Sequence, residues 1–453
     1  MGKVKIDELP IPATPQRSTT CVLEATDATP SFRIGETDKS YKHQYSNIYF
    51  TRLSELRKPI EERALKRWAN LCYVVGTVYM DMPLKPNVLE DIARDHSIPP
   101  PPPPPKYCSP EDSILLEDES GRIKLVGERV KAAGLVTGVV VGALGVETPN
   151  GEFEVVDLCY PGMAPQPAED EDMELDGADE WIAVVSGLGI GSPSSPDVSL
   201  QMLVEYLTGE EGGIQDQGSA ARISRLVIAG NSLAAVVIPI KGDEGDEKKS
   251  AISRGKYNYD TTTFSPHPTE TLAGHLYDIG RVMPIHVLPG ETDPSGTILP
   301  QQPFPRGLLG PVASLRSFSC ETNPTYIRIG GSKGVARTML VNSGQPLNDM
   351  FKYVTSSRLS ILASTLSWRH MAPTAPDTLW CHPYFGVDPF VIRETPDVYI
   401  VGGQKKFGTK LVREEGRRCR LVLVPEFART GTVVLVNVQS LEVKTVKFGI
   451  DGL

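Results

Sequence analysis

The chain has 453 residues, which at roughly 150 residues per domain is enough for two or three domains. Hydrophobic residues make up 40% and charged residues 23%, proportions that permit a sizeable globular core. The 46 Lys and Arg against 56 Asp and Glu give a formal net charge of −10. This charge argues against a protein whose main task is to grip nucleic-acid backbone, since that requires clustered cations. It leaves open a subunit that meets DNA through a partner.

Targeting and metal-binding signals are weak. We find no run of roughly 20 apolar residues that could span a bilayer, and the start MGKVKIDELP lacks the apolar core of a secretory signal. None of the seven cysteines lies within four residues of another, so the close pairs typical of zinc sites are missing. We therefore expect a soluble intracellular protein with free thiols, no metal and no cofactor.

The N-terminal part divides into two segments. Residues 1–40 are rich in Pro, Ser, Thr and charge, which predicts a flexible arm. In residues 41–70 apolar side chains recur at helical spacing, which predicts an amphipathic helical segment. Because proline lacks an N–H and has a fixed φ, Pro59 is expected to split this segment into two helices.

Residues 71–165 have the pattern of a small β-barrel. Short β-rich stretches alternate with Gly, Pro, Asn and Asp, at 71–79, 113–116, 122–126, 135–144 and 151–158. Five such strands in about 90 residues favour an oligonucleotide/oligosaccharide-binding (OB) barrel. The proline run Pro99–Pro105 is interpreted as a stiff loop within this barrel. An acidic stretch, residues 166–180, is predicted to be a solvated linker and the main domain boundary.

Residues 181–453 have an α/β pattern. Strands are predicted at 181–185, 224–229, 283–288, 338–341, 398–401, 421–424 and 432–438, with helices at 198–207 and 269–280. Three short motifs in this region are rejected. The glycines of 187–191 have the wrong spacing for a dinucleotide loop, and Thr409 stands where a phosphate loop needs Lys. Ser232 resembles a hydrolase nucleophile, but Ala234 replaces the final glycine of that motif.

Five strand-end loops have a more informative order. The loops Ser186–Leu188, Gly230–Asn231, Gly290–Asp293, Ser343–Gln345 and Gly402–Lys405 resemble those of calcineurin-like phosphoesterases. In active members these loops read D-x-H, G-D-x-x-D, G-N-H-D/E, an isolated His, and G-H-x-H. They hold two metal ions, which position and activate water for attack on a phosphodiester.

The metal ligands of that pattern are replaced in this sequence. The nine corresponding positions carry Ser186, Leu188, Asn231, Glu291, Thr292, Asp293, Ser343, Gly403 and Lys405. Asp293 is retained, but in the active pattern this position is not a ligand. Leucine, glycine and lysine cannot hold two divalent ions. We therefore predict a degenerate phosphoesterase site with no catalytic and no metal-binding residue.

A helical start, a small barrel and a degenerate phosphoesterase domain together resemble the B-subunit family of replicative DNA polymerases, and within it the small subunits of DNA polymerase delta. The resemblance is carried by the segments YSNIYFTRL, VVGTVYMDMPLKPNVL, LEDESGRIKL, LVTGVVVGALG, VVSGLGIG, PGETDPSGTILPQQP, SGQPLNDM and APTAPDTLWCHPY. The proline loop and the charged insertion at 241–250 depart from it, and their roles are not assigned.

The resemblance implies a fold, a function and partners. The fold would be an OB barrel plus an inactive calcineurin-like phosphoesterase domain at 181–453, preceded by helices. The function would be that of a non-catalytic scaffold in DNA replication and repair, located in the nucleus. It would bind the C-terminal domain of the catalytic subunit and a third subunit, be shared with polymerase zeta, meet DNA indirectly or weakly, and avoid membranes. The alternatives are a single-strand-binding module and an active metal-dependent phosphodiesterase.

Overall fold

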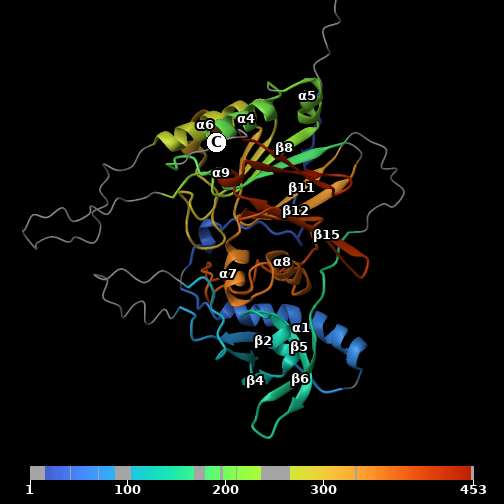
Figure 1. Ribbon diagram of the computed structural model, residues 1–453. Coiled ribbons are helices and arrows are strands. Elements are labelled where there is room, and N and C mark those ends of the chain that lie inside the picture. Colours follow the sequence, from blue (N-terminus) through green and yellow to red (C-terminus); the bar gives the residue numbers. More distant parts are fainter. Residues whose placement is uncertain are drawn as a thin grey trace, which may run out of the picture.

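The computed structural model describes residues 16–40, 42–69, 71–86, 104–167, 179–193, 197–210, 212–235, 266–331 and 334–449. A small barrel at the bottom of Figure 1 is joined to a larger α/β domain above it. The expectations for Pro99–Pro103, for most of the acidic linker (168–178) and for the insertion at 241–250 fall outside the described residues. Within them, no helix has the length and apolar character needed to cross a membrane.

The barrel is closed by five strands, as the sequence predicts. In space the order is β2 (Tyr73–Asp81), β3 (Ser113–Glu117), β4 (Arg122–Val126), β6 (Phe153–Cys159) and β5 (Val140–Glu147). A short helix, α3 (Glu128–Ala132), follows β4. Inward side chains such as Val78, Leu116 and Val141 fill the barrel, because alternate residues of a strand face the same side.

Helix α1 (Asn47–Trp68) corrects one prediction. Pro59 lies inside a single helix and does not divide it into two. The proline costs one backbone hydrogen bond. On either side of it, Leu56 and Ile60 are buried in a cluster with Val140 of the barrel and Val391 of the α/β domain. Packing on both sides therefore outweighs the local preference of proline.

The α/β domain contains two six-stranded sheets. The first has the order β10 (Phe318–Cys320), β9 (Ile285–Leu288), β8 (Ile223–Ala229), β7 (Trp181–Val185), β16 (Thr432–Asn437) and β17 (Val443–Lys447). The second has the order β1 (Cys21–Val22), β11 (Thr325–Gly330), β12 (Ala336–Asn342), β13 (Val398–Gln404), β15 (Arg417–Pro425) and β14 (Gly408–Glu414). The facing sides share one apolar cluster, which includes Val184 and Val227 of the first sheet and Met339 and Ile400 of the second.

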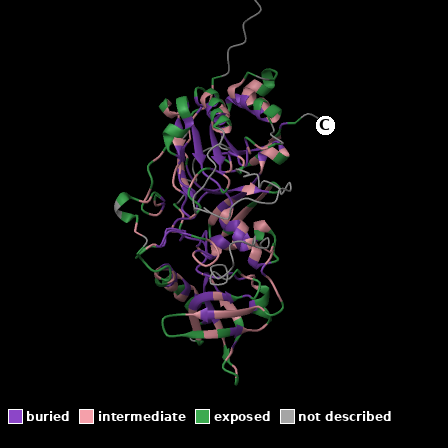
Figure 2. Ribbon diagram, turned by 90° about the vertical axis from the view of Figure 1, so that its left-hand side faces the viewer, coloured by how far each residue is buried: buried purple, intermediate pink, exposed green. Residues whose placement is uncertain are grey.

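Helices cover the outer faces of both sheets. On the first sheet lie α4 (Asp197–Thr208), α5 (Ile214–Ala221), α6 (His267–Gly280), the 3-10 helix η3 (Arg306–Ser314) and α9 (Phe427–Thr430). On the second lie α7 (Gln345–Tyr353) and α8 (Arg358–Ser367), which Figure 1 shows between the sheets and the barrel. Figure 2 shows the strands of the sheets as mainly buried, while the outer helices present exposed residues. The fold prediction of an OB barrel followed by an α/β domain is confirmed.

The N-terminal segment differs from the predicted flexible arm. A short 3-10 helix, η1 (Glu36–Asp38), lies in it, and β1 pairs with β11. The Arg17 guanidinium donates to the carbonyls of Leu207 (2.6 Å) and Ile223 (2.8 Å), and Phe32 is buried against the ring of Tyr326. Residues 16–40 thus pack along the α/β domain. Composition did not predict this packing, because the residues that they contact are distant in the sequence.

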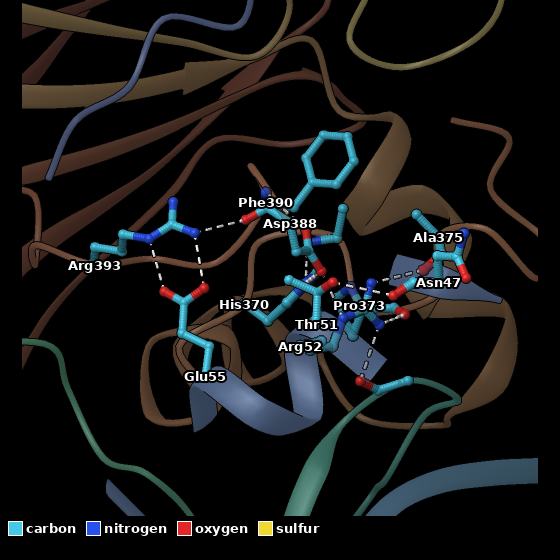
Figure 3. Close-up of polar contacts among 12 residues, drawn as sticks. Asn47, Thr51, Arg52, Glu55, His370, Pro373, Ala375, Asp388, Phe390 and Arg393 are labelled. Carbon is cyan, nitrogen blue, oxygen red and sulfur yellow. Dashed lines mark hydrogen bonds and ion pairs between the residues drawn. The ribbon is translucent and has the colours of Figure 1, made fainter. Parts of the chain in front are cut away.

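Arg52 of α1 organises the contact between the barrel and the α/β domain, and Figure 3 shows its polar contacts. Its side chain is fully buried. Its Nε lies 2.8 Å from Oδ2 of Asp388. Its Nη1 donates to the carbonyls of Gly138 (3.0 Å) and Pro373 (2.8 Å), and its Nη2 donates to that of Ala375 (2.8 Å). One side chain therefore joins the helix, a barrel loop and two segments of the α/β domain.

Gly138 permits this close approach. Its φ is +87°, and a Cβ there would lie 1.9 Å from the carbonyl oxygen of Pro373. A side chain at this position would push the barrel loop away from the α/β domain. At the edge of the same contact, Arg393 forms a two-point ion pair with Glu55 of α1 (2.7 and 2.8 Å; Figure 3).

Asp388 is also held by His370 and by the backbone. Its Oδ2 lies 2.9 Å from Nε2 of His370, and its Oδ1 accepts the N–H of Phe390 (2.9 Å). The Ala372 N–H points at Nδ1 of His370 (3.2 Å), so the ring is neutral and donates from Nε2. Burial opposes ionisation of Asp388, but the Arg52 charge and the hydrogen bonds hold its pKa well below the ordinary value. Burial and the Arg52 charge lower the pKa of His370 to about 4.

We predict that Arg52→Met lowers the free energy of unfolding by about 3–5 kcal/mol, because it leaves the Asp388 carboxylate buried without its counter-ion. The matched control is Arg57→Met on the same helix. Arg57 pairs with Glu119 at the surface, so its loss should cost at most about 1 kcal/mol. Chemical denaturation followed by circular dichroism measures both. Arg52→Met/Asp388→Asn removes the stranded charge and should be more stable than Arg52→Met; a less stable double variant would contradict this account.

The free energy of unfolding should also decrease as the pH is lowered below neutrality. Below about pH 6.5 an unfolded histidine binds a proton, whereas the folded His370 does so only near pH 4. His370 alone should therefore lower the unfolding free energy by roughly 1.4 kcal/mol per pH unit in this window, with Asp388 adding a further loss below about pH 4. Denaturation curves at several pH values measure the slope. His370→Asn should flatten the slope only in part, because burial also lowers the pKa of His275, His286 and His382, which contribute with the same sign. An unchanged slope would count against His370.

Candidate functional site

The predicted degenerate positions lie where strands end. Ser186 follows β7, Asn231 follows β8, and Thr292 and Asp293 follow β9 in the first sheet. In the second sheet Ser343 follows β12 and Gly403 lies at the end of β13. β7, β8 and β9 run parallel to one another, and so do β12 and β13, so within each sheet these carboxyl ends meet at one edge. We call these six residues the strand-end cluster.

Ser186 connects the two sheets within this cluster. Its hydroxyl donates to the carbonyl of Ala229 at the end of β8 (2.7 Å). The same oxygen accepts the N–H of Gly403 at the end of β13 (2.8 Å). The Ser186 side chain is fully buried. Because it bonds to the ends of β8 and β13, it connects a strand of each sheet.

The loops after β8 and β9 are joined by Asn231 and Thr292. Asn231 has a left-handed backbone (φ +59°), and its Oδ1 accepts the N–H of Thr292 (3.2 Å). The Thr292 hydroxyl donates to the carbonyl of Leu233 (2.6 Å). The amide of Asn231 therefore contributes a hydrogen bond between the two loops.

The Asp293 side chain points into the loops and accepts hydrogen bonds from their backbone. Its two oxygens accept the N–H groups of Leu233 and Gly290, each at 2.8 Å. Burial raises the pKa of this carboxyl above its ordinary value, although backbone N–H groups oppose that shift. The retained acid of the pattern is thus a loop-shaping residue.

Ser343 belongs to a network of amides that sequence reasoning missed. Asn323 donates from Nδ2 to the Ser343 hydroxyl (2.6 Å) and to Oε1 of Gln301 (2.7 Å), and its Oδ1 accepts the Ser343 N–H (3.0 Å). Gln345 donates to Gln301 as well (2.9 Å). Gln301 and Gln345 lie in the segments TILPQQP and SGQPLNDM, which carry the family resemblance. That resemblance was the sequence feature that could have identified these two residues. Nothing in the sequence marks Asn323.

Three predicted positions lie outside the strand-end cluster. Leu188 is buried in the apolar core under the outer helices of the first sheet. Glu291 and Lys405 are exposed. Six of the nine positions therefore lie at the strand ends. Two pairs among them are hydrogen-bonded, Ser186 with Gly403 and Asn231 with Thr292, while Asp293 and Ser343 bond to neighbouring loop residues.

Glycines allow the strand ends to approach closely. A Cβ at Gly402 would lie 2.2 Å from the carbonyl oxygen of Ala229, and one at Gly230 would lie 2.3 Å from the Cβ of Ser343. The loops from both sheets are thus in direct contact. Across the described ranges, no group of three or more His, Cys, Asp and Glu side chains is placed to hold a metal ion.

Comparison with known families agrees with this architecture. Residues 44–158 match the family model described as DNA polymerase delta subunit OB-fold domain. Residues 182–409 match the family model for the B subunit of DNA polymerase alpha/epsilon. The two matches follow the barrel and the α/β domain along the chain, and they identify an accessory subunit of the B type.

Relatives narrow this class to one family. The DNA polymerase delta small subunit of Arabidopsis thaliana is 37% identical over 420 residues, covering 89% of this chain and 91% of the relative. That of Saccharomyces cerevisiae is 34% identical over 479 residues, covering 92% of each. Drosophila melanogaster DNA polymerase delta subunit 2 is 32% identical over 430 residues, covering 91% of this chain and 95% of the relative. The chain belongs to the family of DNA polymerase delta small subunits.

We predict that Gly402→Ala destabilises the protein by about 1–3 kcal/mol, since the added methyl would press on the Ala229 carbonyl where the two sheets meet. Gly296→Ala is the control: a Cβ there meets nothing within 4 Å, so its effect should stay within about 0.5 kcal/mol. Thermal and chemical denaturation compare the two variants. Equal effects would mean that the strand ends are not tightly packed.

Proposed function

We propose that this protein is a non-catalytic scaffold of DNA polymerase delta, which binds the C-terminal domain of the catalytic subunit and a third subunit during DNA replication and repair. We further propose that it acts in the nucleus, that polymerase zeta shares it, and that it meets DNA indirectly or weakly. The family membership supports an accessory role. The bridging role rests on the properties of two regions of the chain.

The first region is the strand-end cluster. Its polar groups are engaged with one another and with the backbone, as the bonds of Ser186, Asn231 and Asp293 illustrate. A catalytic site for phosphodiester cleavage needs ligands with open positions toward metal ions and substrate. The cluster is built as a structural joint between two sheets, which favours a degenerate phosphoesterase domain over an active one.

The second region is an exposed aromatic loop, residues 376–387. It begins next to Ala375 and ends next to Asp388, and both of these residues are bound by Arg52. Between these anchors Trp380 is 64% exposed and Phe385 is 69% exposed. Exposed aromatic side chains on a firmly held loop are typical of hot spots for protein partners. By binding both ends of the loop, the buried Arg52 holds the exposed aromatic side chains in place beside the contact between the barrel and the α/β domain.

A single-strand-binding function is less well supported. Such modules stack bases on free aromatic faces of the barrel. The ring of Tyr79 on β2 is instead approached by Lys85 (4.4 Å to the ring centroid) and by Arg122 (5.1 Å). These cations compete with bases for the ring, so the scaffold function is preferred.

The test is co-expression with the C-terminal domain of the polymerase delta catalytic subunit and with the third subunit, followed by sizing with light scattering. We expect a stable complex with one copy of each chain. Separate peaks from folded proteins would reject the scaffold function. That result would favour the single-strand-binding function.

In the same assay, Trp380→Ala/Phe385→Ala should lose one partner and keep the other, with an affinity for the lost partner reduced at least about tenfold. Val146→Ala/Val156→Ala is the control, since these valines are also exposed but lie on barrel strands β5 and β6. Circular dichroism should show both double variants to be folded. Retention of both partners by the aromatic variant would exclude the loop as a docking surface.

A further inference from the structure

One surface of this acidic protein has the opposite charge. Residues 398–413 contain no Asp or Glu but carry four cations. Lys405 and Lys406 lie in the turn after β13, and Lys410 and Arg413 lie on β14. All four are exposed. We call these four residues the cationic edge, because β14 is the last strand of its sheet.

The cationic edge differs from most of the surface in its ion pairing. Among the residues that the structure describes, none of its four cations forms an ion pair with a carboxylate. Elsewhere such pairs are common, for example between Arg63 and Glu414, the residue that follows the edge. Neighbouring like charges repel one another and destabilise the folded protein unless an anion binds to them.

A further cation lies on the neighbouring helix. Gln404, which precedes Lys405, accepts a hydrogen bond from Arg358 of α8 (3.0 Å). Arg358 is also held by Asn348 (2.6 Å) and lies over the ring of Phe351. Both hydrogen-bond acceptors are neutral amides, so they orient the guanidinium without cancelling its charge. Arg358 is half-buried, so its charge adds positive potential beside Lys405 without enlarging the exposed edge.

We propose that the cationic edge binds the phosphodiester backbone of duplex DNA, without sequence preference. Lys410 and Arg413 are three residues apart on β14, so their side chains project to opposite faces of the sheet, and Lys405, Lys406 and Lys410 carry the contact that the test addresses. The outward N–H groups of an edge strand are additional donors for phosphate oxygens. The stretch from Lys405 to Arg413 has one aromatic residue, Phe407, which is 38% exposed, so it lacks the series of stacking platforms that single strands require.

Two rival roles for the cationic edge predict different behaviour. Lysine on an edge strand can simply prevent pairing with another chain. Such edge protection does not account for Lys405 and Lys406, which lie in the turn before β14. The surface could also hold an acidic polypeptide, such as the chain's own acidic run at 169–176. That run is close in sequence to Gln166, which accepts the N–H of Arg418 on β15 (2.9 Å).

The experiment uses the full chain and a fluorescent duplex of about 20 base pairs, with binding followed by anisotropy between about 50 and 200 mM salt. The variant Lys405→Ala/Lys406→Ala/Lys410→Ala should weaken binding at low salt at least about tenfold. It should also reduce the slope of log K against log salt by about 2–3, since each lost phosphate contact contributes about 0.9. The control Lys42→Ala/Lys58→Ala/Lys131→Ala removes the same charge from exposed positions elsewhere and should leave the slope unchanged.

The proposal is overturned by any of three results. Equal weakening by both triple variants would show a non-local charge effect. An unchanged affinity of the first variant would leave edge protection as the role of these lysines. DNA binding that appears only after the acids of 169–176 are changed to amides would identify that run as the occupant of the cationic edge. Because partner assembly is measured separately by sizing, failure of the DNA assay leaves the scaffold proposal intact, and the converse also holds.

Discussion

The buried guanidinium of Arg52 is the interaction on which the arrangement of the molecule depends. A charged side chain without solvent is tolerated only when its donors and its charge are both satisfied. Asp388 supplies the charge, and three carbonyls from the barrel loop and the α/β domain accept the hydrogen bonds. Because these groups come from segments far apart in the sequence, satisfying Arg52 fixes the barrel against the α/β domain.

The same constraint connects stability with the proposed binding surfaces. Arg52 binds the chain at Ala375 and at Asp388, and the exposed Trp380 and Phe385 lie between these two points. A loop anchored at both ends loses little conformational freedom when a partner binds, which lowers the entropic cost of association. On the second sheet, the strand-end cluster and the cationic edge share the end of β13, so the sheet joint and the charged surface are held by one strand.

The strand-end cluster joins the carboxyl ends of strands from both sheets. Parallel strands bring their carboxyl ends together, and glycines allow the loops to touch. The side chains that meet there are Ser186, Asn231, Ser343 and the amides around Asn323, which bond to neighbours of similar polarity. Hydrogen bonds among neutral groups at this position stabilise a joint between sheets, where charged ligands would need metal ions to offset their repulsion.

The sequence alone determined much of this protein. Periodicity and turn residues predicted the five barrel strands and, in the α/β domain, seven strands and the helices α4 and α6, because these signals are local. They did not predict α7 and α8 or the strands β10, β11, β14 and β17. Of the nine positions predicted from the strand-end loops, six lie in the cluster, while Leu188, Glu291 and Lys405 lie outside it. Long-range contacts decided the rest. Composition indicated a flexible arm, but Arg17 and Phe32 find partners in the α/β domain; Pro59 indicated a break, but packing on two sides keeps α1 continuous. Arg52 resembled any surface arginine of an amphipathic helix, and only the tertiary structure placed Asp388 and three carbonyls around it, since burial and pairing depend on residues that are distant in the chain.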